Sequence, residues 1–198
     1  LATHADFEGF ARDHDLDFFE LLEDGRRLHA SDVGDRMIHA GDNPFTFLQE
    51  FCRLRRPLMR DLLQRCWEAC RDADLILATN TEFLIAEAVA ERESIPVVWT
   101  CLQPVAPTRF RASCLFPSWP QRAPGAGAYN LATHALTGWG MWFGQRQALN
   151  EARRDVLDLP PVPMYGPVSS FLSPRFCLDG YSAHVAPRPK DWRSEEHT

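Results

Sequence analysis

The sequence predicts an α/β fold built around a parallel sheet, and three observations support this prediction. An apolar strand over residues 74–79 is followed by a helix over residues 81–93 and by a second apolar strand that begins at Pro96. This β-α-β order predicts parallel strands joined by a right-handed crossover. A long amphipathic helix over residues 44–70 precedes them. The second strand ends in a proline-rich loop, and open α/β sheets bind their ligands at the carboxyl ends of their strands.

The composition is that of one ordinary globular domain. The chain has 198 residues, of which 45% are hydrophobic and 24% are charged, and a chain of this length can bury a sizeable core. The formal net charge of -6 argues against a nucleic-acid partner, because phosphate binding requires a basic surface. No apolar run approaches the roughly 18 residues of a membrane-spanning helix. We therefore expect a cytoplasmic protein.

The first 43 residues predict two short elements and a loop. Apolar residues recur at helical spacing over residues 7–13, which predicts a short amphipathic helix. Residues 16–22 are rich in leucine and phenylalanine and predict a strand. Residues 23–43 are polar and contain three glycines, so we expect a loop there.

Apolar side chains recur at steps of three and four residues through residues 44–70, which predicts the long amphipathic helix. These positions are Phe47, Phe51, Leu54, Leu58, Leu62, Cys66 and Cys70. Pro44 suits the first turn of this helix. Pro57 lies inside it and predicts a kink or a break, because proline has no amide hydrogen to donate.

The second half of the chain predicts a further helix and a last strand. Residues 129–157 predict one long or broken helix, in which three glycines mark a kink or a close approach of another segment. Prolines over residues 159–163 stop this helix. Residues 176–182 predict a short strand, and an extended linker begins at Pro187.

The six cysteines do not predict a metal site. The chain contains no Cys-x-x-Cys pair, and Cys101, Cys114 and Cys177 are scattered along it. We therefore expect free thiols in a reducing compartment and no bound metal.

A serine hydrolase is also excluded by the sequence. The segment from Gly180 through Ser182 to His184 superficially matches a Gly-x-Ser-x-Gly nucleophile elbow, but its last glycine is absent and prolines follow in place of a helix.

Three motifs carry a resemblance to a known family, and they stand in the same order and at the same spacing as in that family. They are Thr3, His4 and Phe7; Gln103, Pro104, Pro107, Thr108, Arg109 and Phe110, followed by Phe116 and Pro117; and Ser182, His184, Pro187, Pro189, Asp191 and Trp192. With these motifs the chain resembles the amino-terminal half of a GT-B glycosyltransferase. The group is the sterol 3-beta-glucosyltransferase-like one, which includes bacterial macrolide- and rhamnolipid-type glycosyltransferases. The resemblance extends from Leu1 to about Trp192.

This resemblance implies a Rossmann-like parallel sheet in a chain truncated at both ends. Residues 1–186 then correspond to the amino-terminal, acceptor-side domain without its first βα unit, and residues 187–192 to the start of the interdomain linker. Residues 193–198 fit no structural pattern, and we expect them to be a non-native tail. The catalytic base of the family lies in the turn after the missing strand, so the catalytic residues of this chain are unknown.

The resemblance also implies a function. A hexose moves from a nucleotide-sugar donor, a UDP- or dTDP-sugar, to a hydroxyl of a lipophilic acceptor such as a sterol, a polyketide or a lipid. The donor is bound mainly by a carboxyl-terminal domain, and no metal or other cofactor is required. We expect the chain alone to be inactive, and a peripheral membrane contact is compatible with such an acceptor. Two alternatives stay open: a non-enzymatic lipid-binding domain, and a GT-B-like sugar-nucleotide epimerase.

The same resemblance implies an acceptor site in residues 103–119. An apolar acceptor requires aromatic walls with a few polar groups that orient its hydroxyl. The residues assigned to acceptor binding are Gln103, Thr108, Arg109, Phe110 and Phe116, with Trp119 as a further wall; those assigned to the cleft are His4, Asn80 and Trp142. Alternatively, Arg109 and the prolines only stabilise the loop, and Trp142 belongs to the core. Plant relatives carry an aspartate where this chain has Thr79 or Asn80, so their His–Asp pair does not transfer.

Overall fold

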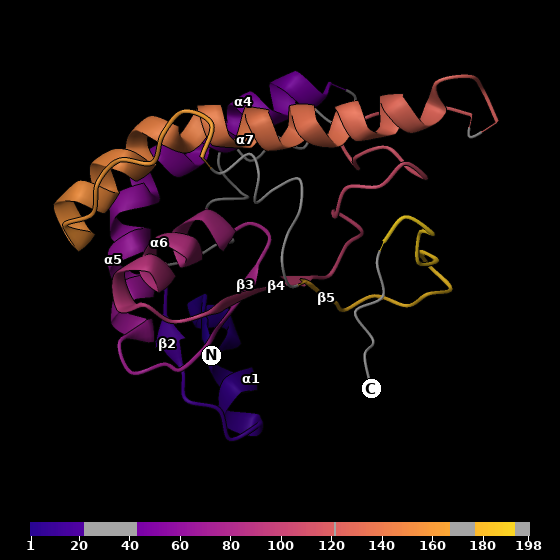
Figure 1. Ribbon diagram of the computed structural model, residues 1–198. Helices are drawn as coiled ribbons and strands as arrows, with labels where there is room; N and C mark the ends of the chain where they lie inside the picture. The colour runs from indigo at the N-terminus through magenta and orange to yellow at the C-terminus, as the bar shows by residue number, and fades with distance from the viewer. Residues whose placement is uncertain (22–42, 121, 167–176, 193–198) are drawn as a thin grey trace.

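The computed structural model describes residues 1–21, 43–120, 122–166 and 177–192. The predicted loop over residues 23–43, apart from Asn43, and the predicted tail over residues 193–198 therefore lie outside the described residues. The described residues form an α/β fold with parallel sheets, as the sequence predicted (Figure 1).

Two parallel sheets make up the strand layer. In the smaller sheet β1 (Ala2–Thr3) pairs with β2 (Phe19–Glu20). In the larger sheet β4 (Val97–Cys101) lies between β3 (Ile76–Thr79) and β5 (Cys177–Asp179). The predicted strands are confirmed in type, but each is shorter than the apolar stretch that predicted it.

The helix predicted near the amino terminus is present but does not bury its apolar residues. A 3₁₀ turn, η1 (Ala5–Phe7), leads into α1 (Glu8–Asp13). Ala11 is the one buried residue of α1, whereas the side chain of Phe10 is 53% exposed and stacks on the ring of His14. Helical spacing alone therefore did not identify a buried face in so short a helix.

The break predicted at Pro57 is confirmed. Helix α4 (Pro44–Arg55) and helix α5 (Met59–Cys70) are separated by a 3₁₀ turn, η2 (Arg56–Leu58), which contains the proline. Of the seven predicted core positions only Leu62 is buried, and the buried positions of α4, Leu48 and Cys52, each follow a predicted position by one residue. The buried hydrophobic residues of the two helices are Leu48, Cys52, Met59, Leu62 and Leu63.

One face of the larger sheet carries the hydrophobic core, and the register shows which residues share that face. Ala78 lies opposite Trp99, which lies opposite Cys177, and side chains alternate between the two faces of a strand. Trp99 packs edge-on against Phe83 of α6 (Phe83–Glu93), with ring centroids 4.2 Å apart. The core joins α5, α6 and α7 to this face, and in Figure 1 these helices lie on one side of the sheet.

The opposite face of the same sheet is exposed. Leu77 and Leu178 point to this other face, and their side chains are 59% and 56% exposed. The apolar stretch that predicted β3 is therefore buried only at every second residue of the strand. Among the described residues no helix covers this side.

Helix α7 (Ala126–Leu157) is long and unbroken, so the glycines do not kink it. They mark a close approach instead. A Cβ atom at Gly144 would lie 2.2 Å from Sγ of Cys52, and one at Gly140 would lie 2.7 Å from Cδ1 of Leu48. Both partners belong to α4, which crosses α7 at this point.

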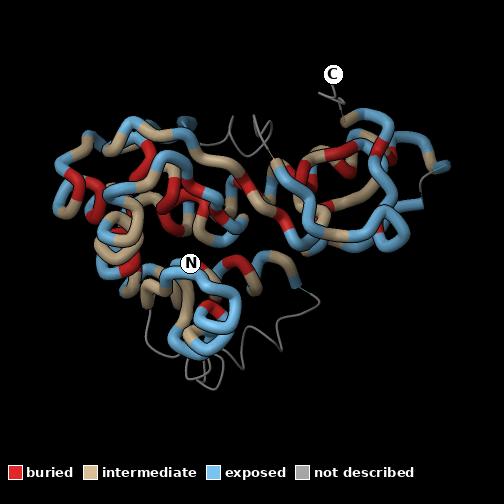
Figure 2. Tube along the Cα trace, turned by 90° about the horizontal axis from the view of Figure 1, so that it is seen from below, coloured by how far each residue is buried: buried red, intermediate tan, exposed pale blue. Residues whose placement is uncertain are grey.

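Buried residues form a second, smaller group beside the core, in the lobe near the carboxyl terminus (Figure 2). This lobe consists of residues 102–120, the first turns of α7 and residues 177–192. Its buried polar residues are Thr108, Ser113, Asn130, Thr133 and His134. No helix in the described part of the chain is long and apolar enough to cross a lipid bilayer.

Candidate functional site

The carboxyl ends of β3, β4 and β5 lie at the same edge of the larger sheet, because all three strands are parallel. Asn80 follows β3, Gln103 follows β4 and Gly180 follows β5. The amide of Gly180 donates to the carbonyl oxygen of Cys101 at 2.8 Å, which holds the two chain ends together just beyond the strands. The predicted acceptor loop, residues 103–119, begins at this edge.

The loop is tied to the predicted linker by an aspartate. The hydroxyl of Thr108 donates to Oδ1 of Asp191 at 2.7 Å, and the amide of Arg109 donates to Oδ2 of the same carboxylate at 2.7 Å. The indole of Trp192 donates to the carbonyl oxygen of Pro107 at 3.0 Å. Residues more than eighty positions apart in the sequence therefore fix the centre of the loop.

The start of α7 holds the loop from the other side. The side-chain amide of Asn130 donates through Nδ2 to the carbonyl oxygen of Arg109 at 2.8 Å. The hydroxyl of Thr133 accepts from the amide of Ser113 at 2.9 Å. The hydroxyl of Tyr129 donates to the carbonyl oxygen of Pro117 at 2.8 Å. The polar side chains at the buried centre of this lobe thus pair with loop backbone that forms no sheet or helix.

Thr108 does not fit the role predicted for it. Its side chain is fully buried, and its hydroxyl is engaged by Asp191 and by the amide of Phe110 at 3.1 Å. A buried hydroxyl in these bonds cannot touch a ligand in this conformation. The correction is that Thr108 holds the loop in place, a role that the structural alternative had given to Arg109 and the prolines.

Five of the six predicted loop residues keep at least part of their surface accessible. Gln103 and Arg109 are exposed, and the side chain of Phe110 is 40% exposed. Phe116 is half-buried, because its ring packs edge-on against Phe45 of α4 with centroids 6.1 Å apart. Trp119 is 50% exposed and lies against the ring of Tyr129. The surface of the loop thus offers aromatic and polar groups together.

Burial and hydrogen bonds shift the pKa values of two side chains in the lobe. Burial alone would raise the pKa of Asp191, but the amide of Arg109 and the hydroxyl of Thr108 donate to its carboxylate, and the net pKa lies below the ordinary value. Burial lowers the pKa of His134, and its Nε2 lies 3.2 Å from the carbonyl oxygen of Arg111. The guanidinium of Arg111 lies 5.2 Å from the ring of Trp192.

The three predicted cleft residues lie on three different elements. His4 follows β1 and is half-buried, and its Nδ1 has no hydrogen-bond partner among the described residues. Asn80 is half-buried at the end of β3. Trp142 is fully buried, and its indole donates to the carbonyl oxygen of Met164 at 2.7 Å. This side chain therefore belongs to the core, as the alternative for Trp142 held, and it also lines the cavity described next.

A cavity of about 470 Å³ lies elsewhere, between α6, α7 and the segment after α7. Its lining includes Ile95 and Val97, which stand at the amino end of β4, and the buried Arg153. The guanidinium of Arg153 is already engaged by Glu91 at 2.9 Å and by the carbonyl oxygen of Pro160. This cavity is thus at the opposite end of the strands from the loop.

The sequence analysis missed one group of side chains at the edge that leads into the loop. Cys101, Cys177 and Asp179 place their sulfur and carboxylate atoms within 4.8 Å of one another. Cys101 and Cys177 are far apart along the sequence, but the pairing of β4 with β5 brings them together in the fold. The spacing of Cys177 and Asp179 was a usable signal, since residues two apart in a strand share a face.

Comparisons with known proteins point to one kind of enzyme. The chain is 28% identical over 202 aligned residues to a sterol 3-beta-glucosyltransferase of Arabidopsis thaliana, covering 97% of this chain and 31% of that protein. It is 29% identical to the sterol 3-beta-glucosyltransferase of Pichia angusta, covering 83% of this chain and 12% of that protein. The sterol 3-beta-glucosyltransferase of Debaryomyces hansenii is 27% identical to the chain, and the aligned segment covers 83% of this chain and 10% of that protein. No family model matches the chain.

The chain thus spans less than a third of the length of these relatives. The similar segment nevertheless covers most of this chain in each comparison, and the fold is α/β with parallel sheets. The resemblance predicted from the motifs is therefore confirmed: the chain is similar to sterol 3-beta-glucosyltransferases over most of its length, and its fold is α/β and Rossmann-like.

Proposed function

We propose that this chain forms the acceptor-binding part of a glycosyltransferase. The reaction transfers a hexose from a UDP- or dTDP-sugar to the hydroxyl of a sterol or another lipophilic acceptor. The similarity to sterol 3-beta-glucosyltransferases over as much as 97% of the chain carries this proposal. Within it, residues 1–186 form the acceptor-side domain of a GT-B enzyme, and residues 187–192 begin the linker to the part that binds the donor.

The acceptor site that we propose is the exposed surface of residues 103–119. A rigid apolar acceptor is held by aromatic walls, and its hydroxyl is oriented by a few polar groups. Phe110 and Trp119 are exposed aromatic residues of this loop, and Phe116 lies half-buried beside α4. Gln103 and Arg109 are exposed polar residues near them in the sequence. The loop also follows the carboxyl end of β4, where open α/β sheets place their ligands.

The hydrogen bonds from Thr108 and Arg109 to Asp191 support the same proposal. A loop that is already fixed loses little conformational entropy when it binds a ligand, so more of the contact energy appears as affinity. In this interpretation Thr108 contributes through the shape of the loop, and the aromatic residues contribute through contact.

The chemistry proposed for the whole enzyme is a single displacement. A general base removes the proton of the acceptor hydroxyl. The acceptor oxygen then attacks the anomeric carbon of the sugar, and the nucleoside diphosphate leaves from the opposite side with its electron pair. We assign no residue of this chain as the base. His4 remains a proposed residue of the cleft, because it stands at the carboxyl end of β1 and its Nδ1 has no hydrogen-bond partner within the described part of the chain.

Binding of a fluorescent sterol to the purified chain tests the acceptor site. We expect saturable binding that weakens by about fivefold to tenfold in Phe110→Ala and in Trp119→Ala, since each removes an aromatic contact. Trp139→Ala is the matched control, because Trp139 is 43% exposed but lies on α7 outside the loop. Equal weakening in all three variants, or no saturable binding by the parent chain, would contradict the proposed site.

Turnover tests the enzymatic part of the proposal. The chain alone should release no nucleoside diphosphate from UDP-glucose or a dTDP-sugar above the blank, because the donor is bound mainly by the other half of such an enzyme. A longer chain that carries this segment and a donor-binding domain should glucosylate a sterol. Sterol binding without turnover in the longer chain would favour the lipid-binding alternative.

A further inference from the structure

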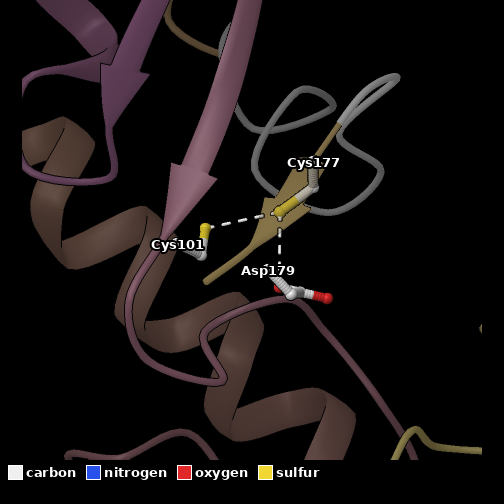
Figure 3. Close-up of side chains that lie close together, drawn as sticks. All are labelled: Cys101, Cys177 and Asp179. Carbon is white, nitrogen blue, oxygen red and sulfur yellow. Dashed lines mark hydrogen bonds between the residues drawn. The ribbon is translucent and has the colours of Figure 1, made fainter. Parts of the chain in front are cut away.

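We propose that Cys101, Cys177 and Asp179 form a zinc-binding site at the carboxyl end of the larger sheet, with one coordination position open to solvent. The proposal is independent of the glycosyltransferase function. It rests on the positions of three side chains from two strands (Figure 3).

The register of the sheet directs all three side chains to one place. Cys101 lies opposite Asp179, and Cys177 lies two residues before Asp179 on the same strand. Side chains at these positions share one face of the sheet. Figure 3 shows the two sulfur atoms and the carboxylate meeting between the ends of β4 and β5.

The distances fit a tetrahedral zinc ion. The two sulfur atoms are 3.4 Å apart, and Sγ of Cys177 is 3.7 Å from Oδ1 of Asp179. Two sulfurs that each lie about 2.3 Å from a tetrahedral zinc ion are roughly 3.7 Å apart, and a sulfur–oxygen pair is slightly closer. The three donors therefore need only small movements to bind one ion.

A disulfide fits the same cysteines less well. Its sulfur atoms would have to approach to about 2.05 Å, from the 3.4 Å observed. The cysteines are also offset by two residues along the ladder. Such an offset, about 6.6 Å along the strand and 4.8 Å across it, separates Cα atoms by roughly 8 Å, beyond the usual disulfide span.

The charges of the group favour a cation. Cys101 is 1% exposed, Cys177 is half-buried and Asp179 is exposed, so an ion can enter from the side of the carboxylate. In the absence of an ion, the thiol of Cys177 donates to the sulfur of Cys101, which raises the pKa of Cys177 and lowers that of Cys101. On zinc binding the thiol protons pass to solvent, and the ion balances the remaining negative charges.

Thiolate donors select zinc over calcium or magnesium, which prefer oxygen ligands. Among the described residues, no fourth protein ligand joins these three. Three protein ligands with one open position is the arrangement in which zinc also binds water or another small ligand.

Cobalt substitution tests the site directly. The purified, reduced chain is titrated with Co²⁺ in the absence of oxygen, and the sulfur-to-cobalt charge-transfer band is recorded. We expect one equivalent of Co²⁺ to bind and to give a charge-transfer band with the intensity typical of two thiolate ligands. Added Zn²⁺ should displace the Co²⁺ and remove the band. Cys101→Ser and Cys177→Ser should each weaken binding more than about 100-fold, beyond the effect typical of residues that only support a ligand. Asp179→Asn should weaken binding by about tenfold or more.

Cys114→Ser is the matched control, because Cys114 is an exposed free cysteine outside the group, and it should leave the titration unchanged. A chain that binds no stoichiometric Co²⁺, or whose band survives both Cys101→Ser and Cys177→Ser, overturns the proposal.

A second measurement uses the unaltered chain, so it tests the site even if the variants do not fold. Alkylation of each cysteine by iodoacetamide is followed by peptide mass mapping with and without Zn²⁺. Zinc should slow alkylation of Cys177 at least tenfold and protect Cys101, while the rate at Cys114 stays constant. Equal rates at Cys177 with and without zinc would overturn the site.

Discussion

Arg55 and Glu82 form an ion pair between α4 and the residue before α6. Two guanidinium nitrogens of Arg55 donate to the two carboxylate oxygens of Glu82 at 2.9 and 2.8 Å, and Nε donates to Oε1 of Gln145 on α7 at 3.1 Å. The side chains of the pair are only 12% and 28% exposed. A planar guanidinium in this geometry connects three helices with one side chain.

Removing one partner of this pair should destabilise the fold. We expect Glu82→Ala to lower the free energy of unfolding by about 1–3 kcal/mol, because the half-buried charge of Arg55 loses its counter-ion. Glu8→Ala is the control, since the pair of Glu8 with Arg12 is exposed and adjacent on one helix, and it should change the stability by less than about 0.5 kcal/mol. Urea unfolding measures both, and equal effects would contradict the assignment.

The bonds to Asp191 should make the lobe sensitive to acid. Its folded pKa lies below the ordinary value, which is about 3.9 in an unfolded chain. Its contribution to stability is therefore complete above about pH 4 and disappears as the pH falls through the folded pKa. We expect Asp191→Asn to lower the unfolding midpoint at pH 6 and to differ less from the parent chain near pH 3. A constant difference across this range would show that the carboxylate charge is not involved.

At the residue scale, the sequence indicated the segment that forms the loop. It did not indicate what each side chain of that segment contacts. The motif from Gln103 to Phe110 was visible in the sequence, but the burial of Thr108 depends on Asp191, which is 83 residues away. The pairing of Cys101 with Cys177 likewise depends on strand order across a gap of 76 residues. Contacts of this kind follow from topology, which local patterns do not encode.

At the scale of elements, α4 and α7 cross so closely that a side chain at Gly144 would collide with α4. A Cβ atom at Gly144 would lie 2.2 Å from Sγ and 2.8 Å from Cβ of Cys52, so one of the helices would have to move. We expect Gly144→Ala to lower the free energy of unfolding by about 1–3 kcal/mol, the usual cost of overpacking. Thermal or urea unfolding monitored by circular dichroism measures the change.

Gly9→Ala in α1 is the control for helix propensity. Nothing lies within 4 Å of a Cβ atom at Gly9, so this substitution should stabilise the helix by up to about 1 kcal/mol. If Gly144→Ala were also stabilising, the close crossing of α4 and α7 would be wrong.

Helix ends that are determined by a nearby proline were predicted well from the sequence. Pro57 breaks the long helix because of its own ring, and the prolines after Leu157 end α7. The exposed face of β3 was not predicted, because an apolar run such as residues 74–79 indicates burial on both faces only when helices cover both. Whether they do so is decided by the arrangement of other segments.

At the scale of the whole molecule, the described helices cover one face of the larger sheet and leave Leu77 and Leu178 exposed on the other. The strands β1 and β3 each pair with one neighbour in the described structure. Exposed apolar faces and unpaired strand edges promote association between chains.

We therefore expect the chain to self-associate as its concentration rises. Substituting both Leu77→Thr and Leu178→Thr should shift sedimentation velocity profiles toward the monomer. Leu136→Gln is the control, since Leu136 is 45% exposed on α7, on the helical side of the sheet. A parent chain that sediments as a monomer at all concentrations, or an equal shift in the control, would rule out this face as the cause.

The bonds around Asp191 also have a mechanical consequence. The contacts of Asp191 and Trp192 with Pro107, Thr108 and Arg109 join the two segments without passing through the sheet. The two segments are therefore expected to move as one rigid unit. A force applied at Asp191 would be transmitted directly to Arg109 and the neighbouring Phe110.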